Sequence, residues 1–140
     1  MKIQQKNIAK LKRKLWPIFS KWRRMKHCLD TTGCKDWGLC ITCGKRYHIK
    51  LLQCGHFVSG RHNGNLFSVK GTAAQCYNCN INLKGATLEY RRQIIKLYGE
   101  GADLELEKEA AQVKKFTVEE IEGLIERYTE EIKGMEKGWC

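Results

Sequence analysis

Two short cysteine pairs constrain the fold of this chain more than any other feature of its sequence. The pairs are Cys40/Cys43, in CITCG, and Cys76/Cys79, in QCYNCN, and 32 residues separate them. A CxxC turn brings two sulfurs to one ion, and two such turns supply the four thiolates that zinc takes in a tetrahedron. The spacing therefore predicts a structural zinc site, because four protein ligands leave no open position on the metal.

Disulfides are the alternative use of the eight cysteines. They belong to oxidising compartments, whereas CxxC pairs in a reducing cytosol more often hold metal. The basic N-terminus has neither the apolar segment nor the cleavage site of an export signal, and no apolar run approaches the roughly 18 residues of a membrane span. We therefore expect a cytosolic protein with no membrane partner. The other four cysteines have no assigned role: Cys28, Cys34, Cys54 and Cys140. Cys54 could replace a zinc ligand, but without a CxxC partner it is better interpreted as a buried thiol.

The formal net charge of +11 is unevenly distributed. Residues 1–35 hold eleven Lys or Arg and one acid, and residues 37–88 hold no Asp or Glu at all. The acid-free stretch contains both cysteine pairs, so the positive surface surrounds the predicted metal site. This asymmetry favours a polyanion, most simply nucleic acid, over a basic face that serves only solubility.

Apolar periodicity predicts helices on both sides of a central irregular segment. Residues 8–25 carry an apolar stripe interrupted by Pro17, which suits the first turn of a helix running to about His27 after a looser basic arm. Residues 30–38 read as a loop, and residues 47–52 give a weak strand signal. Further helices are expected over residues 88–98, after Asp103, and from the capping box that opens at Thr117 and ends at Gly134.

The 140 residues fit one domain with appendages. We expect an α+β, mostly helical fold with three segments: a basic N-terminal helical arm (1–38), a zinc-stapled core (39–99) and a C-terminal helical region (100–140). Too few apolar residues lie between 39 and 83 to hold that segment without metal.

Two polar residues beside the cysteine pairs are the candidates for catalysis. His56, in CGHFVSG, could take a proton from water as a general base. Asn80 directly follows Cys79, and its carbonyl oxygen suits a hard cation such as magnesium or manganese. Taken singly, His56 is best interpreted as a structural histidine and Asn80 as a helix cap. Their position beside the predicted zinc site, on an acid-free basic surface, favours the catalytic interpretation for both.

This arrangement resembles the His-Me finger (HNH) nucleases, small ββα-metal domains in which a histidine is the base and a histidine or asparagine at the helix start holds the cation. Five segments, in order and spacing, further resemble the phage NinG (Rap) recombination-protein family: FSKWRR (19–24), CITCGK (40–45), CGHFVSG (54–60), QCYNCN (75–80) and EYRRQIIKLYG (89–99). The resemblance implies a divalent-cation-dependent endonuclease for branched DNA, including Holliday junctions and D-loops. It also implies a phage or prophage protein in the cytoplasm of a bacterial host, and it leaves a homodimer open.

The sequence departs from these patterns at three places. An aspartate that often precedes the base histidine is Gly55 here, the usual middle asparagine is Gly71, and the family's SGN is KGA at 84–86. Asn63 or Asn65 is a candidate for the missing middle asparagine. With no carboxylate nearby, the cation would depend on Asn80, water and the phosphate.

Phosphate contacts are expected from eight basic residues: Arg23, Arg24, Lys45, Arg46, Arg61, Lys84, Arg91 and Arg92. No segment is built to read base edges, so recognition of DNA shape is expected. The main alternative is a non-catalytic zinc-ribbon DNA-binding or adaptor protein, and an RNA-binding zinc module is a third hypothesis.

Overall fold

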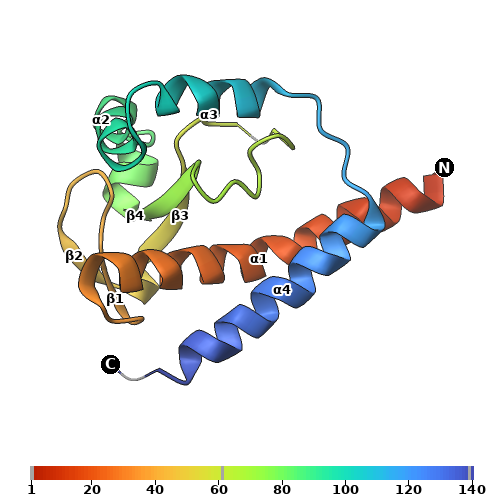
Figure 1. Ribbon diagram of the computed structural model, residues 1–140, viewed down its shortest axis with the longest axis horizontal. Coiled ribbons are helices and arrows are strands. Elements are labelled where there is room, and N and C mark those ends of the chain that lie inside the picture. Colours follow the sequence, from red (N-terminus) through yellow and green to blue (C-terminus); the bar gives the residue numbers. More distant parts are fainter. Residues whose placement is uncertain (1, 61, 139) are drawn as a thin grey trace.

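The computed structural model describes residues 2–60, 62–138 and 140, with residues 2–6 followed as backbone alone. The protein is mostly helical with two small antiparallel sheets, as expected for the α+β class. The elements in chain order are α1 (Lys2–Thr32), β1 (Trp37–Leu39), β2 (Arg46–His48), η1 (Ile49–Leu51), β3 (Leu52–His56), β4 (Thr72–Cys76), η2 (Asn78–Asn82), α2 (Thr87–Tyr98), α3 (Ala102–Ala111) and α4 (Val118–Glu136). In Figure 1 the β3–β4 hairpin lies between α1 on one side and α2 and α3 on the other.

Helix α1 runs unbroken through Pro17 for 31 residues. The prediction of a second helix beginning at Pro17 is therefore wrong. A proline inside a helix costs about 3 kcal/mol because it removes one backbone hydrogen bond. Leu15 and Phe19, on either side of it, are completely buried, and each contributes about 1.5–3 kcal/mol by burial. Tertiary packing thus offsets the local cost.

The largest apolar cluster joins the first helix to the last. Phe19 and Trp22 of α1 pack their rings against Tyr128 of α4 at centroid distances of 5.5 and 4.5 Å. Lys21, which lies between these two aromatic residues of α1, pairs with Glu136 of α4 at 2.8 Å. Figure 1 shows α4 lying along one side of α1, with both helices running from right to left in the view. Residues from the two ends of the chain form one core.

The middle segment forms two hairpins instead of the single strand expected over residues 47–52. In the first, β1 pairs with β2 in the register Trp37↔His48, and in the second β3 pairs with β4 in the register Leu52↔Cys76. Part of the predicted strand is the single turn η1, which connects the hairpins. Only β3 and β4 reach five residues, consistent with the small number of apolar residues available.

The later helices begin and end close to the residues expected from the sequence. Helix α2 stops at Gly99, whose φ of +97° is a conformation that glycine adopts readily. Thr117 caps α4 by accepting a hydrogen bond from the Glu120 amide, as the capping box predicts. The helix continues past Gly134 to Glu136, so the expected stop at Gly134 is wrong by two residues. Among the described helices, none has both the length and the apolar character needed to cross a bilayer.

Candidate functional site

The four cysteines of the two CxxC pairs converge as predicted. Their sulfurs lie within 4.8 Å of one another. One pair sits in the tight turn between β1 and β2, which Gly44 closes with a φ of +73°. The other pair spans the end of β4 and the start of η2. The Ile41 amide donates to the Ala74 carbonyl at 2.9 Å and fixes the first turn against β4.

The surroundings of the cluster fit a zinc ion. Burial opposes ionisation of Cys40, but the amides of Cys43 and Cys76 and the Thr42 hydroxyl lower the pKa of this thiol to about 6. Hydrogen bonds to sulfur favour the thiolate, which is the form that binds metal. A further amide, that of Cys79, donates to the Cys76 sulfur at 3.4 Å. The protein can therefore hold one zinc ion through Cys40, Cys43, Cys76 and Cys79.

The remaining cysteines are not among the four converging sulfurs, although Cys28 packs beside three of these residues. Burial raises the pKa of Cys28 and of Cys54 to about 11, so both are neutral thiols at physiological pH. Cys54 packs in the large apolar cluster that joins α1 to α4, named the α1–α4 cluster from here on. This position agrees with the expectation of a buried thiol. Cys34 and Cys140 form a disulfide that connects the segment after α1 to the segment after α4.

His56, the last residue of β3, is held from two directions. Its Nε2 lies 3.1 Å from the Leu66 carbonyl oxygen. Because a carbonyl only accepts hydrogen bonds, this contact places the proton on Nε2 and makes Nδ1 the lone-pair nitrogen. The ring also stacks on the Trp16 indole of α1, with centroids 5.4 Å apart and planes inclined by 18°.

Asn80 lies in the single turn η2, between the last zinc cysteine and α2. Its amide nitrogen donates to the Gln53 Oε1 of β3 at 2.7 Å. This bond fixes the side-chain orientation and leaves the carbonyl oxygen Oδ1 as the acceptor, 3.2 Å from the position that a side chain on Gly55 would occupy. The asparagine is thus oriented by the strand that carries His56.

His56 and Asn80 line the same cleft, of about 960 Å³. One wall is α1, the floor is the end of β3, and the opposite wall is η2 with the start of α2. No Asp or Glu is among the described residues that line it: Lys12, Arg13, Trp16, Pro17, Cys54, His56, Phe57, Ser59, Gly60, Leu66, Asn80, Ile81, Lys84, Gly85 and Thr87. Lys12, Arg13 and Lys84 make it positively charged.

Sequence reasoning missed the contribution of α1 to this cleft. Lys12 and Arg13 were not among the expected phosphate contacts, and no role was predicted for Trp16. Their positions depend on how α1 crosses β3, and spacing along the chain carries no signal for that crossing. The rim opposite α1 has two non-glycine residues in the left-handed conformation, Lys84 at φ +52° and Ala86 at φ +46°. Backbone strain of this kind often accompanies functional sites.

The loop between β3 and β4 is braced by Asn65. This side chain is buried, and its Nδ2 donates to the Val58 carbonyl at 2.9 Å. The next residue is Leu66, whose carbonyl holds His56, so Asn65 stabilises the loop that orients the imidazole.

Gly71 cannot carry a larger side chain without displacing Ser68, since an added Cβ would lie 2.8 Å from the Ser68 hydroxyl.

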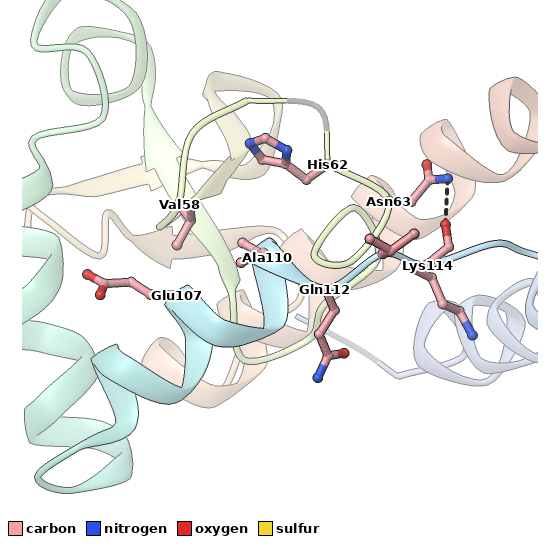
Figure 2. Close-up of a pocket in the computed structure, with 9 residues that line it drawn as sticks. Val58, His62, Asn63, Glu107, Ala110, Gln112 and Lys114 are labelled. Atoms are coloured by element: carbon pink, nitrogen blue, oxygen red, sulfur yellow. Dashed lines mark hydrogen bonds between the residues drawn. The ribbon is translucent and has the colours of Figure 1, made fainter.

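Asn63, the other candidate for the middle asparagine, points into a different cleft. Figure 2 shows this second cleft, of about 650 Å³, between the loop that follows β3 and the end of α3. Asn63 donates to the Lys114 carbonyl at 3.0 Å and accepts from the Lys12 ammonium at 2.5 Å. It therefore connects α1 to the segment before α4, away from His56 and Asn80.

Three of the expected phosphate contacts are partly or fully buried arginines that bind the protein itself. Arg23 is buried and donates to the Val69 carbonyl at 2.9 Å. Arg24 donates to the Ser20 carbonyl of its own helix at 3.1 Å. Arg91 pairs with Asp103 and Glu107 at 2.6 and 2.7 Å, clamping α2 to α3.

The remaining five residues of that set lie elsewhere. Lys45 and Arg46 are exposed near the first cysteine turn, and Lys84 is exposed at the cleft. Arg92 is exposed and pairs with Glu89 at 2.8 Å. Arg61 is outside the described residues. DNA contact stays a prediction for the whole set.

The fold and the cysteine cluster define a small, mostly helical α+β protein with a site for one zinc ion. The family model described as Bacteriophage Lambda NinG protein matches residues 2–138, so the chain belongs to the NinG family, which is related to phage recombination. A segment of 68 residues is also 35% identical to "A disintegrin and metalloproteinase with thrombospondin motifs 19" of mouse and of human. That match covers 44% of this chain and 6% of those proteins, which is a short local similarity. No solved structure matches the chain.

Proposed function

We propose that this protein is a structure-specific endonuclease of the His-Me finger class that cleaves branched DNA, such as Holliday junctions and D-loops, by phosphodiester hydrolysis. The observation that carries the proposal is that His56 and Asn80, 24 residues apart in sequence, line one positively charged cleft beside the cysteine cluster. Membership of a family related to phage recombination supports branched DNA as the substrate.

His56 acts as the general base in this mechanism. Its Nδ1 takes a proton from a water molecule, and the resulting hydroxide attacks the phosphorus as the bond to the leaving oxygen breaks. The leaving oxygen then takes up a proton from solvent, and the imidazolium returns its proton to solvent. The Leu66 carbonyl keeps the proton of the neutral ring on Nε2 and stabilises the imidazolium that forms. Trp16 holds the ring plane through stacking.

Asn80 is the residue that would hold a magnesium or manganese ion, through Oδ1. Such a cation, when bound, neutralises charge on the scissile phosphate. Because the Asn80 Nδ2 is bonded to Gln53, the oxygen is left as the acceptor for such a cation. Lys12, Arg13 and Lys84 attract the flanking phosphates from opposite walls.

A zinc-dependent DNA-binding protein without catalysis is the second candidate. One observation favours it: the His56 ring is stacked and hydrogen-bonded, as a purely structural histidine would be. Both candidates use the same basic surface, so DNA binding alone does not separate them.

A cleavage assay on a synthetic four-way junction separates these candidates. We expect magnesium- or manganese-dependent nicking of the junction and little cutting of a linear duplex of the same sequence. His56→Ala should slow cleavage by about a hundred- to ten-thousand-fold with junction affinity nearly constant. His62→Ala is the matched control, since His62 is exposed and lines the second cleft, and it should cut at the parental rate.

Asn80→Ala should behave differently from His56→Ala. It should raise the cation concentration needed for half-maximal rate as well as slow the cut, because the base stays in place while the cation site weakens. Tight junction binding with no cleavage in either metal, or a zinc-loaded His56→Ala protein that cuts at the parental rate, would favour the non-catalytic candidate.

A further inference from the structure

An unpaired buried oxygen lies next to the residues proposed for catalysis. It is Gln75 Oε1, which has no hydrogen-bond partner among the described residues, although the Gln75 side chain is completely buried. Leaving a buried carbonyl unpaired costs about 1–3 kcal/mol. Native structures tolerate few such atoms, and a bound ion or water is a common reason for one.

The orientation of the Gln75 amide is fixed by its nitrogen. Nε2 donates to the Thr42 hydroxyl at 3.1 Å and to the Gly85 carbonyl at 3.0 Å. Because the Gly85 carbonyl can only accept, the nitrogen must be on that side of the amide and the oxygen on the other. The unpaired atom is therefore the oxygen.

Gln75 Oε1 and Asn80 Oδ1 meet beside Gly55. A Cβ built on Gly55 would overlap Gln75 Oε1 and lie 3.2 Å from Asn80 Oδ1. The absence of a side chain at Gly55 thus leaves room for two amide oxygens from different elements, β4 and η2. Asn80 donates through Nδ2 to Gln53, so its oxygen is also oriented as an acceptor.

We infer that Gln75 is a second protein ligand of the divalent cation, acting together with Asn80. Amide carbonyl oxygens are hard ligands that magnesium and manganese accept, and both ions retain several waters when bound by few protein groups. The inference rests on the proposed function, because it assigns to the proposed cation site a buried residue that does not itself line the cleft but lies beside Asn80. It gives the buried oxygen a partner and explains how a site with no carboxylate obtains more than one protein ligand.

Manganese binding to the zinc-loaded protein tests this inference without any cleavage. The probe is Mn²⁺ alone, followed by the decrease of the free-ion signal in electron paramagnetic resonance. Two neutral oxygens predict weak binding by the parental protein, and Gln75→Ala should weaken it at least tenfold. Asn78→Ala is the matched control, since it removes an exposed amide from the same turn as Asn80, and it should bind Mn²⁺ like the parental protein.

A paired substitution makes the test sharper. Removing the Gln75 side chain vacates the position that a Gly55 side chain would need, so Gly55→Asp combined with Gln75→Ala places a carboxylate there. The double variant should bind Mn²⁺ at least tenfold more tightly than Gln75→Ala alone, whereas Gly55→Asp alone should disturb the fold. If Gln75→Ala proves unstable, Gln75→Glu keeps an oxygen, adds a negative charge and should tighten binding.

The possible results separate the inference from the proposed function. A folded, zinc-loaded Gln75→Ala protein with parental Mn²⁺ affinity overturns the inference, and so does a parental protein that binds no Mn²⁺. If either protein still cuts junctions, the endonuclease stands without Gln75 as a ligand. Mn²⁺ binding that depends on Gln75, in a protein that never cuts DNA, supports the cation site and refutes the endonuclease.

Discussion

The α1–α4 cluster and the cysteine cluster differ in what holds them together. Phe19, Trp22 and Tyr128 dominate the first, with aliphatic side chains around them. The second consists of six buried residues of which four are cysteines, three of them zinc-site residues, with Leu52 and Ala74 as the others. Small side chains bury little apolar area. The helical pair can therefore be stabilised by packing, whereas the two hairpins need metal.

The cleft lies where these two regions meet. The α1 wall supplies Lys12, Arg13 and Trp16, and the opposite wall, next to the cysteine cluster, supplies Asn80. Loss of zinc should therefore remove the proposed chemistry and leave part of the positive charge in place. The following experiments test that division, beginning with the largest expected effect.

Replacing Cys76 with Ser should remove one thiolate and with it the zinc. Zinc binding to small sites contributes roughly 10–16 kcal/mol and is coupled to folding, so residues 39–83 should lose order while α1 and α4 keep helical structure. Metal analysis together with amide hydrogen exchange would measure both effects. Cys54→Ala, which removes a buried thiol outside the cluster, should keep the zinc. Full protection over residues 39–83 in a zinc-free protein would show that the hairpins do not depend on metal.

Phe19→Ala tests the opposite region. Phe19 is completely buried and contacts aromatic rings of both α1 and α4, so the cavity should lower the free energy of unfolding by about 3–5 kcal/mol. Zinc content should be unchanged. Val113→Ala, at a side chain that is 94% exposed, should change stability by less than about 0.5 kcal/mol. Urea denaturation of zinc-loaded protein gives these values, and loss of zinc from folded Phe19→Ala would mean that the regions are not separable.

Removing charge from the α1 wall should affect DNA binding more than folding. The double variant Lys12→Ala/Arg13→Ala should reduce the slope of log affinity against log salt by about 1.8, which is roughly 0.9 per phosphate contact. Lys10→Ala/Lys14→Ala removes the same charge from exposed positions of the same helix outside the cleft. Equal slopes for the two double variants would indicate a diffuse charge effect.

The smallest expected effect is a pH dependence of stability at the end of α1. Burial lowers the pKa of His27, whose ring bonds the Leu39 carbonyl at 2.6 Å. A histidine with a lowered pKa in the folded state releases its proton on folding, so its full stability is present above the unfolded value of about 6.5. Stability should fall as the pH drops below that value toward the pKa of the folded state. The free energy of unfolding, measured by denaturant melts at a series of pH values, should depend on pH differently in the parental protein and in His27→Gln only in this window.

Local signals made the cysteine site and the helix ends predictable. Each pair of zinc ligands is identified by a CxxC motif that spans only four consecutive residues. The capping of α4 by Thr117 likewise depends only on the first turn of that helix. Pro17 shows the limit of such reasoning, because its local penalty is offset by partners more than 100 residues away. Sequence identified His56 and Asn80 as candidates but gave no information on what surrounds them.

Residues that act through long-range packing were not predictable. Arg23 looked like a surface cation and is buried against Val69. Trp16 had no predicted role, and its ring stacks on His56. The unpaired oxygen of Gln75 depends on the pairing of β3 with β4 and on the absence of a side chain at Gly55. None of these relations has a periodicity or a spacing that a single sequence can reveal.

The packing of the first helix against the last also affects how the protein is made. Phe19 emerges from the ribosome long before Tyr128, its ring partner in α4. At about 5–20 residues per second, the apolar face of α1 waits roughly 5–20 seconds for that partner. During this interval the nascent chain presents an aromatic helix face to chaperones and to neighbouring nascent chains. Productive folding of this protein should therefore depend on the translation speed of the codons between Phe19 and Tyr128, which is a property of the messenger and not of the finished fold.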